Sequence, residues 1–389
     1  MPAMPDTHAR TTDKASARAA SILGLCLPGD TLLYLLLPMQ HEAFGVTLAE
    51  AGLLLAANRL VRIFGYSHVM RFYARRGDRP VCVLAAATAA LCALGYATLS
   101  GFWWLLLLRL GWGLTYAALN LSTQVMATAE PTGAARRTGR SRALIATGPM
   151  LALPLGALVS VEYGPRVIFL LMALTSLVAL LLAFGLPSEP HPLASSSRRF
   201  QRPDSVALWS FIEGLVLDGL FIIGLSLQAE QLMAGNAVLV AGGLLALRYV
   251  SEMLLSPLGG LAAQRWGATR MLIVFSLLTS VALVGFGCHW LIVGGALVLV
   301  LRALQLPLVV TVVAQRHPGA GRVRALAANA VWRDIGAGVG PLIAGLLLPV
   351  ASTVWVYSLA AGCLAVSALA CREVGVRGEE GRQASAEEA

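Results

Sequence analysis

Apolar stretches recur along the whole chain and alternate with short polar connections. Most are about 20 residues long, the length of helix that crosses a hydrocarbon core about 30 Å thick. The pattern predicts twelve membrane-spanning helices, at residues 19–39, 48–70, 80–99, 103–127, 142–162, 166–186, 206–228, 237–259, 271–287, 290–314, 325–349 and 353–371. We therefore expect an all-α integral membrane protein.

The composition agrees with this expectation. Of the 389 residues, 57% are hydrophobic and only 13% are charged, and the mean hydropathy is +0.74. Soluble domains carry about 25% charged residues. The deficit excludes a soluble protein with a single core.

The positively charged residues gather in alternate connections. The connection "RFYARRGDR" after the second span holds four arginines, and the connection after the fourth span holds Arg136, Arg137, Arg140 and Arg142. Such asymmetry marks the cytoplasmic side, so both termini are expected there. The net charge of +9 is thus a topology signal spread over short loops, and no nucleic-acid partner is expected. The predicted location is the bacterial cytoplasmic membrane, which the chain crosses many times.

The longest polar stretch between spans divides the chain into two halves. Residues 187–205, "PSEPHPLASSSRRFQRPDS", are expected to form a cytoplasmic linker. The predicted units are a cytoplasmic tail (1–18), a first six-helix bundle (19–186), a second six-helix bundle (206–371) and a cytoplasmic C-terminal tail (372–389).

The second half repeats features of the first in the same order. Three pairs of positions correspond, at separations of 193, 190 and 188 residues: Arg109 with Arg302, Gly77 with Gly267, and Gly148 with Gly336. A duplicated unit explains this order better than chance. Duplicated halves that enclose a site near the bilayer midplane are a transporter architecture, here two pseudo-symmetric bundles.

These repeated motifs resemble those of the major facilitator superfamily, over nearly the whole chain. In that family the pattern G-x-L-A-D-R-x-G-R-R helps to latch the cytoplasmic side. The positions that fit it are Arg75, Gly77 and Arg79 after the second span and Gly260, Arg265 and Gly267 after the eighth. In the first copy Met70 and Ala74 replace a glycine and the acid, which weakens the implied latch.

Glycines in the fourth, fifth and eleventh spans extend the resemblance. Arg109 and Gly113 fit the family's fourth-span pattern R-x-x-q-G. A fifth-span glycine pattern is associated with exporters in the family. The fifth-span positions that fit it are Gly139, Gly148, Gly156 and Ala157, whereas Ala152 and Leu153 replace its G-P pair. In the eleventh span the positions that fit it are Gly336, Gly340 and Pro341. The resemblance thus implies efflux. Plain helix packing is the alternative, since small residues at four-residue spacing let helices approach closely.

Ionisable residues inside the spans are few. They are Asp30, Arg59, Arg62, Arg109, Glu213, Asp218, Arg248, Glu252, Arg302, Arg333 and Asp334. Each charge at the bilayer centre costs at least ~2.5–3.5 kcal/mol, so these groups are expected to face the interior in pairs. The repeat predicts the pairs Asp30–Arg59 and Asp218–Arg248, and Arg248 also shares a helix face with Glu252.

Asp30 is the first candidate for proton coupling. A carboxylate beside an arginine takes up a proton when a substrate or a rearrangement separates the pair, and intramembrane acids mark transport pathways. An acid in the first span is also a frequent coupling position in the drug exporters that this chain resembles. Asp218 and Glu213 follow as second and third candidates. The alternative is a permanent structural pair.

Several polar and aromatic residues are candidates for lining a substrate cavity. They are Tyr34, Asn58, Trp112, Tyr116, Asn120, Tyr249 and Trp332. Packing is the alternative for each aromatic residue. The interior arginines either neutralise the acids or attract an anionic or metal-chelating substrate.

The combined prediction is a proton-coupled exporter of a small organic molecule, such as a drug-like compound or a siderophore. An importer of a small metabolite or siderophore is the alternative, and a transporter-like membrane sensor is a third possibility. An enzyme is not expected, because the six histidines are scattered and no nucleophile, metal or phosphate-loop motif is present. The expected partners are the substrate, protons and the lipid bilayer, for a monomer without a cofactor or metal.

Overall fold

The computed structural model describes residues 5–190, 203–233 and 237–372. In these residues the chain forms helices and no strands. The helices of the first half are α1 (Pro5–Met39), α2 (Leu48–Arg76), α3 (Asp78–Thr98), α4 (Phe102–Ala127), α5 (Ala134–Tyr163) and α6 (Val167–Ala183), with a 3₁₀ turn η1 (His41–Phe44).

The second half holds the remaining six predicted spans. Its first span consists of α7 (Ser205–Glu213), a π-helical segment η2 (Gly214–Leu220) and α8 (Phe221–Leu232). The others are α9 (Ala237–Trp266), α10 (Ala268–Gly287), α11 (Leu291–Arg316), α12 (Arg322–Leu347) and α13 (Thr353–Ala370), with a 3₁₀ turn η4 (Gly319–Gly321) before α12. Among the described residues, nine stretches are long and apolar enough to cross a membrane, and α6 is a shorter apolar helix. The expected all-α membrane fold is confirmed.

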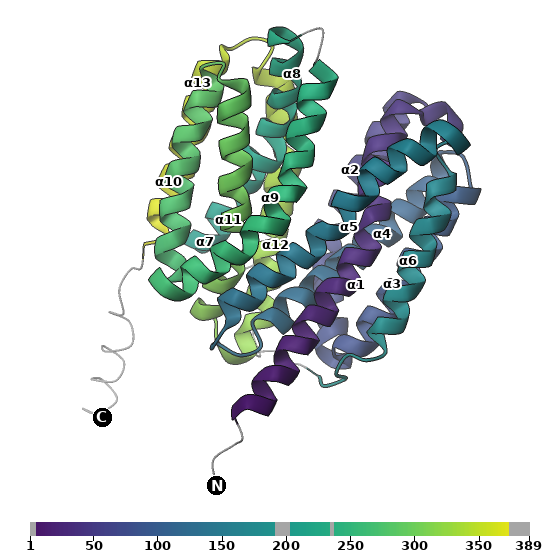
Figure 1. Cartoon of the computed structure of the whole chain (residues 1–389), viewed down its shortest axis with the longest axis vertical. Coiled ribbons are helices and arrows are strands. Elements are labelled where there is room, and N and C mark those ends of the chain that lie inside the picture. The colour runs from purple at the N-terminus through teal and green to yellow at the C-terminus, as the bar shows by residue number, and fades with distance from the viewer. Residues whose placement is uncertain (1–4, 191–202, 234–236, 373–389) are drawn as a thin grey trace.

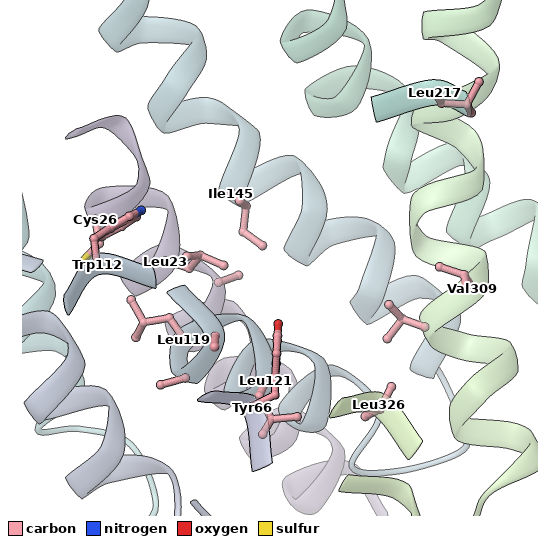
Figure 2. Packing of buried hydrophobic residues seen from close by; sticks show 14 of the residues in the cluster. Leu23, Cys26, Tyr66, Trp112, Leu119, Leu121, Ile145, Leu217, Val309 and Leu326 are labelled. Carbon is pink, nitrogen blue, oxygen red and sulfur yellow. The ribbon is translucent and has the colours of Figure 1, made fainter. Parts of the chain in front are cut away.

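Helices α1–α6 form one bundle and α7–α13 form the other (Figure 1). Helix α1 begins and α13 ends on the same side of the molecule, which we call the terminal side. The two bundles lie close together toward this side and diverge toward the opposite side. Within the first bundle, apolar side chains of α1, α4 and α5 meet, including Leu23, Trp112 and Ile145 (Figure 2).

The start of the chain differs from the expectation. Residues 5–18, which the sequence assigned to a tail, continue α1 as one helix. The Arg18 guanidinium donates to the Gly185 carbonyl, and Asp13 pairs with Arg136 of α5 at 2.8 Å. These contacts dock the polar turns onto the first bundle. Most of the expected linker and C-terminal tail, residues 191–202 and 373–389, lie outside the described residues.

Helix α5 also begins earlier than expected, at Ala134 rather than at 142. Gly133 adopts a left-handed conformation with φ 76°, which ends the preceding loop. The arginines assigned to a loop therefore lie on a helix. This shift moves Arg142 into the bundle.

Two corresponding glycines allow close helix packing inside each bundle. A Cβ atom on Gly148 of α5 would collide with the Gly24 carbonyl of α1. A Cβ atom on Gly336 of α12 would collide with the Phe211 carbonyl of α7. The close contact of α5 with α1 in the first bundle therefore recurs as the contact of α12 with α7 in the second, as the sequence repeat predicts.

The bundles contact each other through α5 and α9 and through neighbouring helix ends. A Cβ atom on Gly139 would lie 2.6 Å from the Ser256 carbonyl oxygen of α9. Thr138 and Thr311 share a hydrogen bond of 3.1 Å between their hydroxyls. Arg322 Nη1 donates to the carbonyl of Thr128 at 2.6 Å. These contacts join the bundles on the terminal side.

Candidate functional site

A pocket lies between the two bundles and takes its lining from both. From the first bundle it is lined by Tyr66, Tyr116, Asn120, Gln124 and Arg142, and from the second by Trp209, Glu213, Gln305, Leu306, Val309, Val310, Asn329, Ala330, Arg333 and Asp334. Figure 2 shows Tyr66 and Val309 projecting from opposite bundles.

In the first bundle, Asp30 of α1 pairs with Arg109 of α4. Arg109 is fully buried, and its Nη1 contacts Asp30 Oδ1. Asn58 Nδ2 donates to the same oxygen at 3.2 Å, and Arg109 Nε donates to the Leu54 carbonyl at 3.1 Å. The Tyr34 ring centroid lies 5.1 Å from the Arg109 guanidinium. One guanidinium thus neutralises one acid.

The expected pair of Asp30 with Arg59 is wrong. Arg59 Nη1 donates instead to the Ala337 carbonyl of α12, in the other bundle. The face of α2 that carries Arg59 packs against α12, so its side chain points away from α1. The guanidinium from α4 occupies the place beside Asp30.

The second bundle contains a larger charge network. Asp218 lies 2.7 Å from Arg302, 2.5 Å from Arg333 and 3.4 Å from Arg248, measured between oxygen and nitrogen atoms. The expected Asp218–Arg248 pair is therefore confirmed. Two further acids join the same arginines, which makes three acids and three arginines in one cluster.

Glu213 and Glu252 are those two acids. Glu213 accepts from Arg333 Nε at 2.8 Å and lies 3.6 Å from Arg302 Nε. Glu252 accepts from Arg302 Nη1 at 2.5 Å and from Arg248 Nε at 3.3 Å, the expected contact along one helix face.

The π-helical segment η2 explains how one span supplies two of the acids. Glu213 ends α7, and Asp218 lies five residues later inside η2. The i→i+5 bonding of a π-helix brings residues five apart toward one face, and such segments occur frequently at functional sites. Both carboxylates thus face Arg302 and Arg333.

An ion pair crosses between the bundles beside the pocket. Arg62 Nη2 of α2 lies 3.3 Å from Asp334 Oδ1 of α12, and both side chains are largely buried. The Arg62 guanidinium also lies 4.6 Å from the centroid of the Tyr116 ring. Arg333 and Asp334, adjacent in sequence, therefore engage different partners, as expected.

Of the seven candidate cavity residues, Tyr116 and Asn120 line the pocket. The other five lie elsewhere: Tyr34 beside Arg109, Asn58 beside Asp30, Trp112 in the first-bundle core, Tyr249 with its ring 5.8 Å from Arg248, and Trp332 packed edge-on against Phe211 at 6.3 Å. Of the candidate coupling acids, Glu213 lines the pocket, and Asp30 and Asp218 lie outside its lining.

Sequence reasoning missed the amide and guanidinium side chains of Gln124, Arg142, Gln305 and Asn329 and the aromatic residues Tyr66 and Trp209 in the pocket lining. A signal for Gln124 was present, because Tyr116, Asn120 and Gln124 follow one another at four-residue spacing on one face of α4. Arg142 was assigned to a loop, because its apolar neighbours begin only after it.

The loop motifs lie on the terminal side. Gly77 and Gly267 have φ values of 76° and 89°, which the turns after α2 and α9 require. Where the family pattern has its acid this chain has Ala74, but Asp78 is buried nearby and accepts a 2.6 Å hydrogen bond from the Tyr73 hydroxyl. Ser122 of α4 donates to the same oxygen.

The remaining motif residues differ in exposure. Arg75 and Arg79 are exposed, and Arg265 lies 5.4 Å from the centroid of the Trp266 ring. Gly113 of α4 faces the Asn58 carbonyl, and a Cβ atom built on Gly113 would lie 2.7 Å from that carbonyl oxygen. Gly156 of α5 packs against the side chain of Leu32 of α1.

The second glycine set has contacts of its own. Gly260 of α9 faces the Ala135 carbonyl of the first bundle, where a Cβ would collide. Gly340 packs against Gly219 of η2, and a Cβ atom built on Gly340 would lie 2.7 Å from the Gly219 Cα atom. Pro341 follows Gly340 inside α12.

Comparison with known proteins identifies related sequences and folds. The family model described as Major Facilitator Superfamily matches residues 20–229 and 216–388. No curated protein matches the chain.

Similar solved structures include the human organic anion transporter MFSD10 (TETRAN), with a TM-score of 0.72, 18% identity and coverage of 92% of this chain and 99% of that one. The proton:xylose symporter XylE, bound to 6-bromo-6-deoxy-D-glucose, has a TM-score of 0.70, 14% identity and coverage of 92% and 95%. The transporter FucP, in the outward conformation, has a TM-score of 0.70, 14% identity and coverage of 92% and 97%. At these identities the likeness concerns the fold alone.

Proposed function

The chain belongs to the major facilitator superfamily, and we propose that it is a proton-coupled secondary transporter that exports a small organic molecule. The observation that carries this proposal is the pocket built from both bundles, with the Arg62–Asp334 pair crossing beside it. A site shared between bundles changes its access when the bundles move against each other. We take this pocket as the substrate site.

The arrangement of the bundles supports alternating access. The hydrogen bonds of Thr138 with Thr311 and of Arg322 with Thr128 join the terminal side. The positive connections predict that this side is cytoplasmic. We therefore assign the described arrangement to a state closed toward the cytoplasm, in which a substrate leaves toward the outside.

Asp30 remains the proposed coupling acid. It has one arginine partner, Arg109, whereas Asp218 has three. Each additional guanidinium stabilises the charged carboxylate and opposes protonation. Freeing Asp30 therefore requires breaking one ion pair, and protonation of Asp30 would release Arg109 from α1. Asp218 and Glu213 follow as alternative coupling acids.

Export is favoured by the glycine pattern of α5, including Gly148 and Gly156, which is associated with exporters in the family. A drug-like compound or a secreted siderophore is the proposed cargo. Import is the second candidate, because the similar structures include a proton:xylose symporter. The bacterial cytoplasmic membrane, with both termini inside, is the proposed location.

The test uses inverted membrane vesicles with an imposed proton gradient. Compounds from both cargo classes are added, and dissipation of the gradient is followed for the wild type, Asp30→Asn and Glu230→Gln. Glu230 is an exposed acid on α8 and serves as the matched control. We expect compound-dependent proton release in the wild type and in Glu230→Gln, and its loss in Asp30→Asn.

Two outcomes would contradict the proposal. Equal proton release in the wild type and Asp30→Asn would move coupling to Asp218 or Glu213. Compound uptake that is independent of the proton gradient in every variant would refute proton coupling.

A further inference from the structure

The interior charges of the described chain do not balance. Its five interior acids, in the first-bundle pair, the second-bundle network and the crossing pair, each contact at least one arginine. Two interior arginines form an ion pair with none of them. Arg59 donates to a backbone carbonyl, and Arg142 has neither an ion pair nor a hydrogen bond with any described residue. The interior thus carries more positive than negative charge.

Arg142 faces the pocket from α5. It lies about 12 Å along the helix from Ala134, at the start of the predicted span 142–162 and inside the apolar stretch Ala134–Ser160. Glu252 is the acid among its electrostatic neighbours, which also include Arg302 and Arg333. Arg302 and Arg248 already hold Glu252, at 2.5 and 3.3 Å. No acid therefore remains available to neutralise Arg142 among the described residues.

An unpaired guanidinium inside a membrane protein is costly unless water or a counter-ion accompanies it. A guanidinium binds carboxylate, sulfonate and phosphate groups through paired N–H donors. The pocket is also lined by two carboxylates, Glu213 and Asp334, which Arg333 and Arg62 already hold in ion pairs. Its other lining groups include the neutral hydrogen-bonding side chains of Asn120, Gln124 and Asn329 and the aromatic rings of Tyr116 and Trp209. This lining suits an anionic head group with a flat apolar body.

We propose that Arg142 is the anion-binding residue of the pocket and that its ligand is a small organic anion with an aromatic or apolar body. The proposal rests on the proposed function, because it names the substrate class of the same pocket. An anionic lipid head group carries similar chemistry, so the experiment separates a soluble anion from a lipid.

The experiment measures thermal unfolding of the purified full-length chain in a neutral detergent, followed by tryptophan fluorescence. Sodium benzoate is titrated at constant total sodium, and benzamide serves as the uncharged analogue. Benzenesulfonate and phenyl phosphate extend the series, and phosphatidylglycerol is added in a separate arm. The variants are Arg142→Gln, Arg142→Lys and Arg140→Gln. Arg140 is an exposed arginine on the same helix and is the matched control.

We expect at least one of the soluble anions to raise the unfolding temperature of the wild type and of Arg140→Gln, with benzamide having no such effect. Apparent affinity should fall roughly tenfold to hundredfold in Arg142→Gln, the equivalent of one charge-assisted hydrogen-bond contact. Arg142→Lys should retain part of the affinity. Without an anion, Arg142→Gln should unfold at or above the wild-type temperature, because an unpaired, partly buried charge has been removed.

Three results would overturn the proposal. One is equal stabilisation of Arg142→Gln and the wild type by the soluble anions. Another is the absence of stabilisation of the wild type by any of them, and the third is stabilisation by phosphatidylglycerol alone. Since binding is measured without a proton gradient, an anion site that survives while coupling fails would refute the transport mechanism and leave this inference intact.

Discussion

The two bundles neutralise their interior charges in different ways, although one repeat built both. Arg109 and Arg302 occupy corresponding positions, 193 residues apart. Arg109 contacts one acid, Asp30, whose carboxylate also accepts a hydrogen bond from the neutral side chain of Asn58. Arg302 contacts three acids, each of which a second arginine also holds. The arginine at this repeated position therefore forms a single ion pair in the first bundle and lies at the centre of a charge network in the second.

This difference separates two physical roles. A carboxylate held by several guanidiniums resists protonation and holds its helices in a fixed arrangement. A carboxylate with one partner can change its charge by breaking one contact. The second-bundle network suits a structural role, and the Asp30–Arg109 pair suits a proton switch. The π-helical segment η2 contributes to this asymmetry, because it brings Glu213 and Asp218 to one cluster.

The largest expected effect comes from removing the centre of the network. Arg302→Gln leaves Glu213, Asp218 and Glu252 with too few cations, and breaking a buried pair costs about 3–5 kcal/mol. Arg109→Gln should cost less, because it removes the cation from one acid rather than from three. Thermal unfolding of both variants in detergent, with the exposed Arg140→Gln as control, measures the difference. Equal losses in the two arginine variants would refute the division of roles.

A smaller effect is expected at the shared helix contact, where the bundles should behave alike. Gly148→Ala and Gly336→Ala each push a methyl group into a backbone carbonyl, and overpacking costs roughly 1–3 kcal/mol. Gly345→Ala is the control, because a Cβ there meets no atom within 4 Å. It should instead stabilise α12 by up to about 1 kcal/mol. Unfolding temperatures that fall in only one bundle would show that the repeated contact is not equivalent.

The crossing pair should contribute less again. Arg62→Gln and Asp334→Asn each leave one group of the pair at the bundle interface. A double-mutant cycle on the unfolding free energy should give a coupling of about 0.5–3 kcal/mol, in the lower part of that range because the atoms lie 3.3 Å apart. A coupling of zero would mean that the bundles are held together without this pair.

The sequence predicted the helices better than it predicted their faces. Twelve spans, the repeat and the Asp218–Arg248 pair follow from periodicity and spacing, which are local properties. The partner of Asp30 depends on how α2 is rotated, and contact with α12 of the other bundle sets that rotation. Spacing along one chain segment carries no information about it.

The position of Arg142, near the start of a helix, also could not be predicted from local sequence properties. Polar residues at the start of α5 have the composition of a loop, yet the helix begins at Ala134 and carries Arg142 into the pocket. The four-residue spacing of Tyr116, Asn120 and Gln124 indicates a polar face on α4. That this face turns toward a shared pocket depends on tertiary packing.

The smallest predicted effect concerns the first residues of the two bundles. Asp204 caps α7 by accepting a 2.7 Å hydrogen bond from the Ala207 amide, whereas α1 continues to Pro5 as a polar helix. The hydrogen bond with His317, at 3.5 Å, and the Ala207 amide lower the pKa of the Asp204 carboxyl. Its charged form therefore stabilises the fold above its unfolded pKa, and this contribution is lost as the pH falls through the lowered folded pKa.

Asp204→Ala should cost less than about 1 kcal/mol at neutral pH, because the carboxyl group is partly exposed to solvent. The difference between wild type and variant should persist from neutral pH to about pH 4 and shrink below it. Unfolding temperatures across this range measure it, with Glu230→Gln as an exposed-acid control. A difference that stays constant below pH 4 would assign the capping to something other than the charged carboxylate. Because this cap lies outside the pocket, proton-coupled transport by Asp204→Ala should match the wild type.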